Sequence, residues 1–248
     1  GGNSLNFFGN NILGTTDGVL VLDNANTYTG GTIIESGGLR VSNASGSGTG
    51  TGPVTVEATA LLSGTGRVGG AVTVDAGGTI APGTSIGTLT ALSGVTLNGT
   101  YACEIGGASA DRLAVTGTLN VSNGTLDLTE LNVPTGTSFT IATATTVQGT
   151  FATVEGLRPG LTLVYNSTSI VIERTPILHV DAAASPGGTG VSWGSALKTL
   201  DDALAYAISG DEIWVKEGVY VPGNGSGSPS STFAVPDGIQ LLGGFDGT

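Results

Sequence analysis

The fold is decided by the ten residues Thr32-Ile-Ile-Glu-Ser-Gly-Gly-Leu-Arg-Val41, in which two short apolar β runs flank a glycine-containing turn. This pattern recurs along the chain. Its first runs are spaced by 22, 18, 23 and 24 residues, because they begin at Thr32, Val54, Val72, Val95 and Leu119. Its second runs lie near Leu39, Leu61, Thr79, Tyr101 and Leu126. One copy is too short to bury its own apolar face, so the repeat predicts copies stacked into a β-solenoid.

The composition supports an ordered all-β repeat. Of the 248 residues, 39% are hydrophobic, 10% are charged and 44 are glycine. The formal net charge is −12 and the seven basic residues are scattered, so no basic stripe exists to bind the phosphates of a nucleic acid. No run of about 18 apolar residues occurs, and we therefore expect no membrane span within these residues. Because the chain starts at Gly1 without a leader, we expect a processed or partial chain.

Few residues point to catalysis or to a bound metal. The single cysteine, Cys103, lies in an apolar run and is expected to be a small buried residue. The single histidine, His179, cannot build a histidine metal cluster, and its position in a strand run favours a structural role. Asp111 and Arg112 could form a bound pair or mark a carbohydrate contact. We predict no catalytic, cofactor-binding or metal-ligating residues, and leave calcium binding at an acidic turn open.

The pattern between the strands predicts the remaining architecture. Residues 42–52 contain only Ser, Asn, Ala, Gly and Thr and are expected to form a loop that protrudes from the coil. The glycines of residues 64–70 are read as corners of the coil. Apolar residues at spacings of three and four predict one helix near residues 195–209, with Ser192 or Ser195 as its N-cap and Gly210 at its end.

The predicted fold is an all-β, right-handed parallel β-helix with this one short capping α-helix. We expect two domains: a β-helical repeat region at residues 1–175, and at residues 176–248 the helix-capped start of a second, incomplete β-helix. With stacked strands about 4.8 Å apart, the first would contain roughly eight to ten rungs.

Several motifs resemble known surface proteins. Residues 27–41, Thr-Tyr-Thr-Gly-Gly-Thr-Ile-Ile-Glu-Ser-Gly-Gly-Leu-Arg-Val, resemble the autotransporter-associated β-strand repeat of bacterial passenger domains. Residues 78–89, 110–119 and 149–157 are similar to the stretch that follows such repeats, so the resemblance covers about residues 15–174. It implies a right-handed parallel β-helix that is displayed outside the cell and is adhesive or structural. It also implies that Asp111 and Arg112 form a turn ahead of a strand, which favours a structural role for them.

Residues 177–248 resemble the opening of pectin-lyase-like β-helix domains. The matching residues are Trp193, the apolar positions of residues 200–207, Gly-Asp-Glu-Ile-Trp-Val at 210–215 and Gly-Val-Tyr at 218–220. The resemblance implies a helix laid across the first rung of a new solenoid. Enzymes of that superfamily carry their catalytic residues on later rungs, which these residues do not include.

Side chains that face outward suggest two surface functions, glycan binding and ice binding. Trp193 and Trp214 are candidates for a glycan contact, and core packing explains the same aromatic residues equally well. Threonine-rich faces suggest ice binding, which requires a regular threonine ladder. The irregular spacing of the repeats argues against such a ladder.

We therefore expect an extracellular structural or adhesive surface protein of a bacterium of Gram-negative type, acting as a stalk or self-assembling scaffold without catalysis or cofactor. Its expected partners are further copies of itself, surface glycans or the cell envelope. The alternative is the N-terminal fragment of a β-helical polysaccharide lyase or of a glycan-binding protein.

Overall fold

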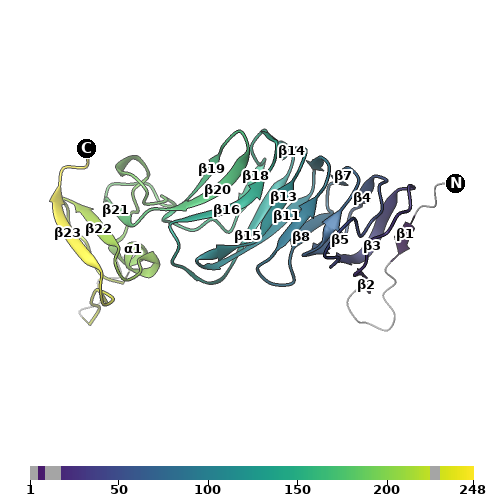
Figure 1. The fold of residues 1–248 in the computed structure, drawn as a ribbon. Coiled ribbons are helices and arrows are strands. Elements are labelled where there is room, and N and C mark those ends of the chain that lie inside the picture. Colours follow the sequence, from purple (N-terminus) through teal and green to yellow (C-terminus); the bar gives the residue numbers. More distant parts are fainter. Residues whose placement is uncertain (1–4, 9–17, 224–229) are drawn as a thin grey trace. The chain divides into compact units, whose positions relative to one another are not determined.

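The computed structural model describes residues 5–8, 18–223 and 230–248, and its contacts divide the chain into two units (Figure 1). Unit 1 contains residues 1–156 and 164–171, and unit 2 contains residues 157–163 and 172–248. The division falls within the strands β19 (Leu161–Tyr165) and β20 (Ser169–Arg174). Each unit is described separately below.

Unit 1 is a parallel β-helix whose rungs have three faces. The first face is formed by β1 (Leu5–Phe8), the start of β3 (Thr32–Val41), β4 (Val54–Val56), β7 (Val72–Val74), β10 (Val95–Leu97), β14 (Thr118–Asn120) and β17 (Thr146–Gln148). The second face is formed by β2 (Val19–Leu22), the end of β3, β5 (Ala60–Gly64), β8 (Thr79–Pro82), β11 (Thr100–Gly107), β15 (Thr125–Pro134) and β18 (Thr153–Glu155). The third face is formed by β6 (Arg67–Val68), β9 (Thr88–Ala91), β13 (Arg112–Val115), β16 (Ser138–Thr143), β20 and β19. The short β12 (Ser109–Ala110) pairs antiparallel with β11.

The observed register confirms the repeat that the sequence predicts. Each residue that starts a first run is paired with its counterpart on the next rung: Thr32, Val54, Val72, Val95 and Leu119. On the second face the paired residues are Leu39, Leu62, Ile80, Tyr101 and Leu126. The stacked copies therefore form continuous columns along the solenoid.

These inward columns are the core of unit 1. Val54, Val72, Val95 and Leu119 are each 1–2% exposed, and Leu39, Leu62 and Leu126 are fully buried. Burial of one such side chain contributes roughly 1.5–3 kcal/mol, so stability accumulates along the columns. Tyr101 is the one large polar side chain in the second column, and its hydroxyl donates a 2.6 Å hydrogen bond to the carbonyl of Ile141. The column therefore holds no unsatisfied hydroxyl at this residue.

The prediction of a protruding loop at residues 42–52 is wrong. Ser47 and Thr49 are buried, and the N–H of Gly48 donates a 2.8 Å hydrogen bond to the carbonyl of Arg67 on the next rung. The buried side chain of Asn43 accepts a 3.0 Å hydrogen bond from the N–H of Arg67. The segment is thus the third face of its rung. Its apolar pattern is absent because backbone and asparagine hydrogen bonds, rather than apolar side chains, hold it in place.

The number of rungs is also lower than predicted. Within the described residues, the first face contains seven strands, from β1 to β17. The strands of residues 138–143, 161–165 and 169–174 belong to the third face and add no further rung to the first. Seven strands at about 4.8 Å give a rise of about 29 Å.

The irregular repeat spacing does not prevent a regular outer surface. Outward-facing Thr79, Thr100, Thr125 and Thr153 are paired in sequence across β8, β11, β15 and β18. The differences in repeat length fall in the turns and leave the strands in register. The argument against a threonine ladder from spacing was therefore wrong, and the observed ladder is a single row on this face.

Unit 2 contains a three-stranded parallel sheet of β21 (Ile177–Val180), β22 (Glu212–Lys216) and β23 (Gln240–Phe245). The 3₁₀-helix η1 (Trp193–Ser195) and the helix α1 (Leu200–Tyr206) connect β21 to β22. Leu178, Val180, Ile213 and Val215 point toward α1, where they meet the side chains of Leu200, Ala203 and Leu204 in one apolar core. The alternate residues His179 of β21 and Trp214 of β22 lie on the opposite face.

The helix is shorter than predicted and has a different N-cap. Thr199 caps it, since its hydroxyl accepts a 3.1 Å hydrogen bond from the N–H of Asp202. Ala196 has a ψ angle of 147°, and Leu197 forms a parallel bridge with Val180, so these two apolar residues cover the edge of β21 instead of continuing a helix. At the other end, Ala207 leaves the helical conformation with a ψ angle of 145° before Gly210 is reached. The apolar spacing predicts the helix correctly at residues 200–206, but Ala196 and Leu197 precede the helix and lie at the edge of β21.

Glycines at one corner of unit 1 allow the rungs to approach closely. A Cβ atom built on Gly70 would lie 1.8 Å from the carbonyl oxygen of Gly52, and one on Gly52 would lie 2.0 Å from that of Gly30. Both obstacles are backbone atoms, which a side-chain rotation cannot remove.

We predict that Gly70→Ala destabilises unit 1 by about 1–3 kcal/mol, because the added methyl group forces two rungs apart. Urea unfolding followed by circular dichroism measures the loss. Gly31→Ala is the matched control, since its Cβ would lie 3.2 Å from the carbonyl oxygen of Pro53 at the equivalent corner. Equal stability of the two variants would contradict close stacking at Gly70.

Candidate functional site: an aromatic cluster in unit 2

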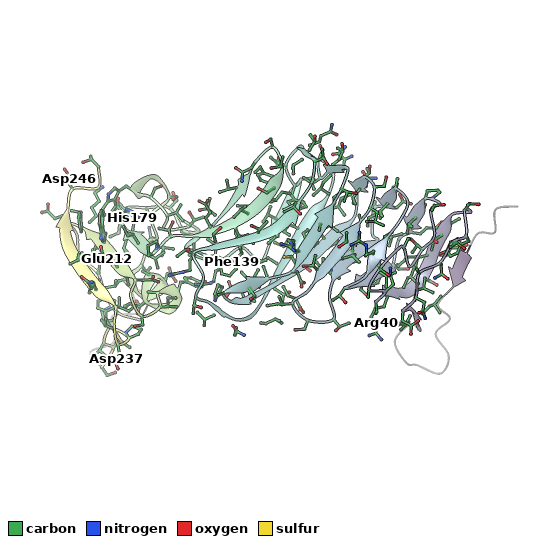
Figure 2. The ribbon with its side chains drawn as sticks, viewed as in Figure 1. Arg40, Phe139, His179, Glu212, Asp237 and Asp246 are labelled. Atoms are coloured by element: carbon green, nitrogen blue, oxygen red, sulfur yellow. The ribbon has the colours of Figure 1, made fainter. Side chains whose placement is uncertain are left out.

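Strand alternation places an aromatic cluster on the face of the unit 2 sheet that points away from α1. Leu178 and Val180 are buried toward the core, so the intervening His179 points outward from β21 (Figure 2). The same alternation turns Trp214 outward from β22, where it is paired with His179. Trp193 of η1 and Phe245 of β23 complete the group, and all four side chains are half-buried.

The four rings of this cluster contact one another in a closed circuit. Trp214 stacks on Phe245 with ring centroids 4.7 Å apart and planes at 8°. His179 meets Trp193 and Trp214 edge-on, at 4.7 and 5.7 Å, and Trp193 lies 5.7 Å from Phe245. Aromatic pairs in these geometries contribute about 0.5–1.5 kcal/mol beyond their buried area. The contacts fix the orientation of each ring.

Hydrogen bonds hold the polar atoms of the cluster. The indole N–H of Trp214 donates a 2.7 Å hydrogen bond to the carboxylate of Glu212, two residues earlier on the same strand. The Nδ1 atom of His179 lies 3.0 Å from the carbonyl oxygen of Gly190, which also accepts the backbone N–H of His179. The loop of residues 181–196 is thereby tied to the ring of His179.

An ion pair lies beside the cluster. The ammonium group of Lys216 is 2.9 Å from the carboxylate of Asp181, and the other oxygen of Asp181 accepts a 2.8 Å hydrogen bond from the N–H of Ala183. The hydrogen bond from Lys216 and that from Ala183 hold the pKa of Asp181 below its usual range. The carboxylate of Asp181 is therefore ionised at neutral pH.

A pocket of about 400 Å³ opens next to Trp193. It is lined by the loop that follows β21, including Asp181, Ser185, Thr189, Trp193 and Ser195. The base of this loop is closed by a 2.7 Å hydrogen bond from the N–H of Gly190 to the carbonyl of Ser195. The site thus combines one aromatic wall with a carboxylate and several hydroxyl groups.

The structure brings the two predicted glycan residues, Trp193 and Trp214, into one cluster but gives them different surroundings. Trp193 lines the pocket, whereas Trp214 stacks on Phe245 and is not among the pocket residues. Tyr220 lies apart from these rings, with its hydroxyl donating to the carbonyl of Lys216. Sequence reasoning missed His179 as a member, although its register with Trp214 could have been read from the alternation of the two strands.

The candidate residues of unit 1 have structural partners. The buried carboxylate of Asp111 accepts hydrogen bonds from the N–H groups of Gly87 at 2.8 Å and of Glu104 at 2.9 Å, and so joins two rungs. This favours the turn interpretation of Asp111 over a carbohydrate contact. Cys103 is a free thiol and 1% exposed, as expected, and burial followed by the charge of Asp111 raises its pKa well above the usual range.

The described residues contain neither a cluster of metal ligands nor a membrane-spanning helix. Across residues 5–8, 18–223 and 230–248, no group of three or more His, Cys, Asp or Glu side chains is placed to hold a metal ion. None of the helices in this part of the chain has the length and apolar character needed to cross a bilayer.

Comparison with known proteins supports the first of the two resemblances. Residues 17–41 match the family model of the passenger-associated-transport-repeat. In the structure this segment contains β2, the corner that follows it, and β3, so the matched repeat is one turn of the solenoid. No curated protein matches the chain. The match supports an autotransporter passenger domain on the bacterial surface, while the resemblance of residues 177–248 to pectin-lyase-like domains stays a prediction.

We predict that Asp111→Asn destabilises unit 1 by about 1–2 kcal/mol, since an amide can accept only one of the two backbone hydrogen bonds and leaves a buried N–H without an acceptor. Chemical denaturation measures the change. Asp127→Asn is the control, because Asp127 is exposed on β15. Equal losses in the two variants would show that the paired hydrogen bonds contribute nothing specific.

The wild type and Asp111→Asn together test the protonation of Asp111. Burial raises the pKa of its carboxyl group to about 6 and outweighs the two backbone hydrogen bonds, which act in the opposite direction. The folded state therefore binds a proton at Asp111 more tightly than the unfolded state does. Protonation of Asp111 stabilises the folded state fully below about pH 4, and this stabilisation is lost as the pH rises through about 6. The stability of the wild type relative to Asp111→Asn should therefore fall across this range, and a rise would contradict the raised pKa.

Proposed function

We propose that this chain is the structural part of a surface protein of a Gram-negative-type bacterium, in which unit 1 serves as a β-solenoid stalk that is not itself catalytic. The observation that carries the proposal is the in-register stacking of the first face from Thr32 to Leu119, together with the match of one turn of the solenoid to a passenger repeat. A stack of this kind gains stability from each rung and needs no ligand to hold it together.

The outer surface of unit 1 supports a structural role. The outward positions of the second face carry a row of threonines, and the neighbouring row carries small or acidic residues such as Ala81, Ala102 and Asp127. The formal net charge of −12 favours solubility and mutual repulsion of the lateral surfaces. Contacts between copies are thus expected at the ends of a sheet rather than along the sides of the solenoid.

This role predicts surface display without turnover of glycans. Fused to a secretion signal and an autotransporter barrel in a Gram-negative host, the chain should become accessible to antibody on intact cells, because a stacked solenoid can fold as its rungs emerge. The purified chain should release no products from acidic polysaccharides such as polygalacturonate. Turnover of such a polymer by the purified chain would favour the alternative of a lyase fragment, and retention inside the host would argue against a passenger role.

Self-association is the second part of the proposal, and the edge of unit 2 supports it. Leu241 on β23 continues the core column of Leu178 and Ile213, which are 2% and 0% exposed, yet Leu241 itself is 42% exposed. Among the described residues β23 is an outer strand of its sheet, and an outer strand with an exposed apolar side chain can pair with a strand of another molecule. A second copy of the chain is the partner we propose.

We predict that the sedimentation coefficient of the wild type rises between about 1 and 100 μM and that Leu241→Lys keeps the chain monomeric, because a charge at the column end opposes stacking. Val219→Lys is the matched control, since Val219 is 85% exposed and lies outside the sheet. A wild type that stays monomeric over this range would overturn self-association.

A further inference from the structure

We propose that the pocket beside Trp193 binds a neutral pyranose sugar, a function distinct from the structural role of unit 1. The structure places an indole ring, an ionised carboxylate and hydroxyl groups around a single cavity of about 400 Å³. A pyranose has one face of C–H groups and a rim of hydroxyls, which matches an apolar wall with polar groups at its edge.

Trp193 supplies the apolar wall. Contacts with His179 and Phe245, at 4.7 and 5.7 Å between ring centroids, hold the indole in place, and this half-buried residue is part of the lining of the pocket. Trp214 acts through the same cluster, since it stacks on Phe245 and packs against His179. Trp193 is thus the proposed contact residue and Trp214 a positioning residue.

Asp181 supplies the main polar anchor. Each of its carboxylate oxygens already accepts one hydrogen bond, from Ala183 and from Lys216, and each retains a further lone pair for a sugar hydroxyl. The hydroxyl groups of Ser185 and Thr189 are on exposed residues of the same lining. Hydrogen bonds from neutral hydroxyls to a carboxylate are charge-assisted and therefore stronger than those between neutral groups.

Charge selects against acidic sugars. The carboxylate of a uronic acid would meet the carboxylate of Asp181, whose counter-ion Lys216 is already engaged at 2.9 Å. Lys198, the second cation that acts on Asp181, donates a 3.0 Å hydrogen bond to the carbonyl of Ala184. The negative net charge of the chain adds to this repulsion at longer range. The ligand class is accordingly a neutral pyranose rather than the acidic units of pectin.

The pocket is formed before any ligand binds. The N–H of His179 donates a hydrogen bond to the carbonyl of Gly190, and the N–H of Gly190 donates one to the carbonyl of Ser195. Both halves of the loop are thereby held against the sheet. At Gly188 the two halves of the loop approach so closely that an added Cβ would lie 2.0 Å from the carbonyl oxygen of Ala196. A preorganised loop loses little conformational entropy on binding.

The test is a titration of the full chain with the methyl glycosides of glucose, galactose and mannose, followed by saturation-transfer NMR and by tryptophan fluorescence. The chain has two tryptophans, both in the cluster, so the fluorescence reports on this site. For a ligand of this size we expect a dissociation constant on the order of 1 mM for the best of the three sugars. Glucuronic acid is expected to bind more weakly.

Gly194→Leu is the decisive variant. Gly194 lines the pocket, an added Cβ there would find only the hydroxyl of Ser192 at 3.9 Å, and the backbone is free of positive φ strain. The leucine should occupy the cavity and weaken binding at least about tenfold while the aromatic cluster stays intact. Gly18→Leu is the matched control, because Gly18 also has open space and lies in unit 1.

Trp193→Ala should likewise weaken binding, and thermal unfolding of the variants verifies that unit 2 remains folded. Three results would each overturn the proposal: no saturable binding of any methyl glycoside up to about 50 mM, unchanged binding in Gly194→Leu, or tighter binding of glucuronic acid than of the neutral sugars. None of these results bears on the surface display or self-association of the chain, which are tested separately.

Discussion

Parallel hydrogen bonding between successive rungs is the constraint on which the rest of unit 1 depends. It holds equivalent residues about 4.8 Å apart, so a residue that points inward on one rung must be matched by inward residues on its neighbours. The column of Thr32, Val54, Val72, Val95 and Leu119 satisfies this condition. A shift of one residue in any rung would turn its apolar side chains to the solvent, and the register is therefore strongly specified. Corners without side chains, as at Gly70, follow from the same close spacing.

This constraint explains what the sequence could predict. Apolar residues at every second position identify strands, and equal counterparts on each copy identify the pairing partner, so the five repeat starts predicted their observed register correctly. The third face was harder to recognise. In the rung of residues 42–52 it is held by backbone and side-chain hydrogen bonds, such as that of Asn43 with Arg67, and these leave no apolar pattern. Composition alone therefore suggested a protruding loop where the structure has a buried side of the coil.

The candidate site shows a different limit of sequence reasoning. Trp193 and Trp214 could be selected from the sequence because they are aromatic, but their separate roles depend on tertiary placement. Trp193 borders the pocket, whereas Trp214 stacks on Phe245. His179 joins them because β21 and β22 are paired in register. In the same way, the apolar periodicity of residues 196–208 did not reveal that Leu197 covers the edge of β21, since a helix and a bridged extended segment can expose apolar residues at similar spacings.

Pockets occur in both units, but they are built differently. In unit 1 outward side chains such as Thr100 and Thr125 stand directly beside their counterparts on the next rung, and a pocket of about 330 Å³ lies on this face, where its lining includes Leu61, Ala81 and Ala102. In unit 2 a long connection joins β21 to α1, and hydrogen bonds at Gly190 hold this connection against the sheet. The pocket beside Trp193 depends on this connection, which supplies nearly all of its lining. Residues 181–196 are therefore where a binding function can be added to this chain without disturbing the columns that stabilise its solenoid.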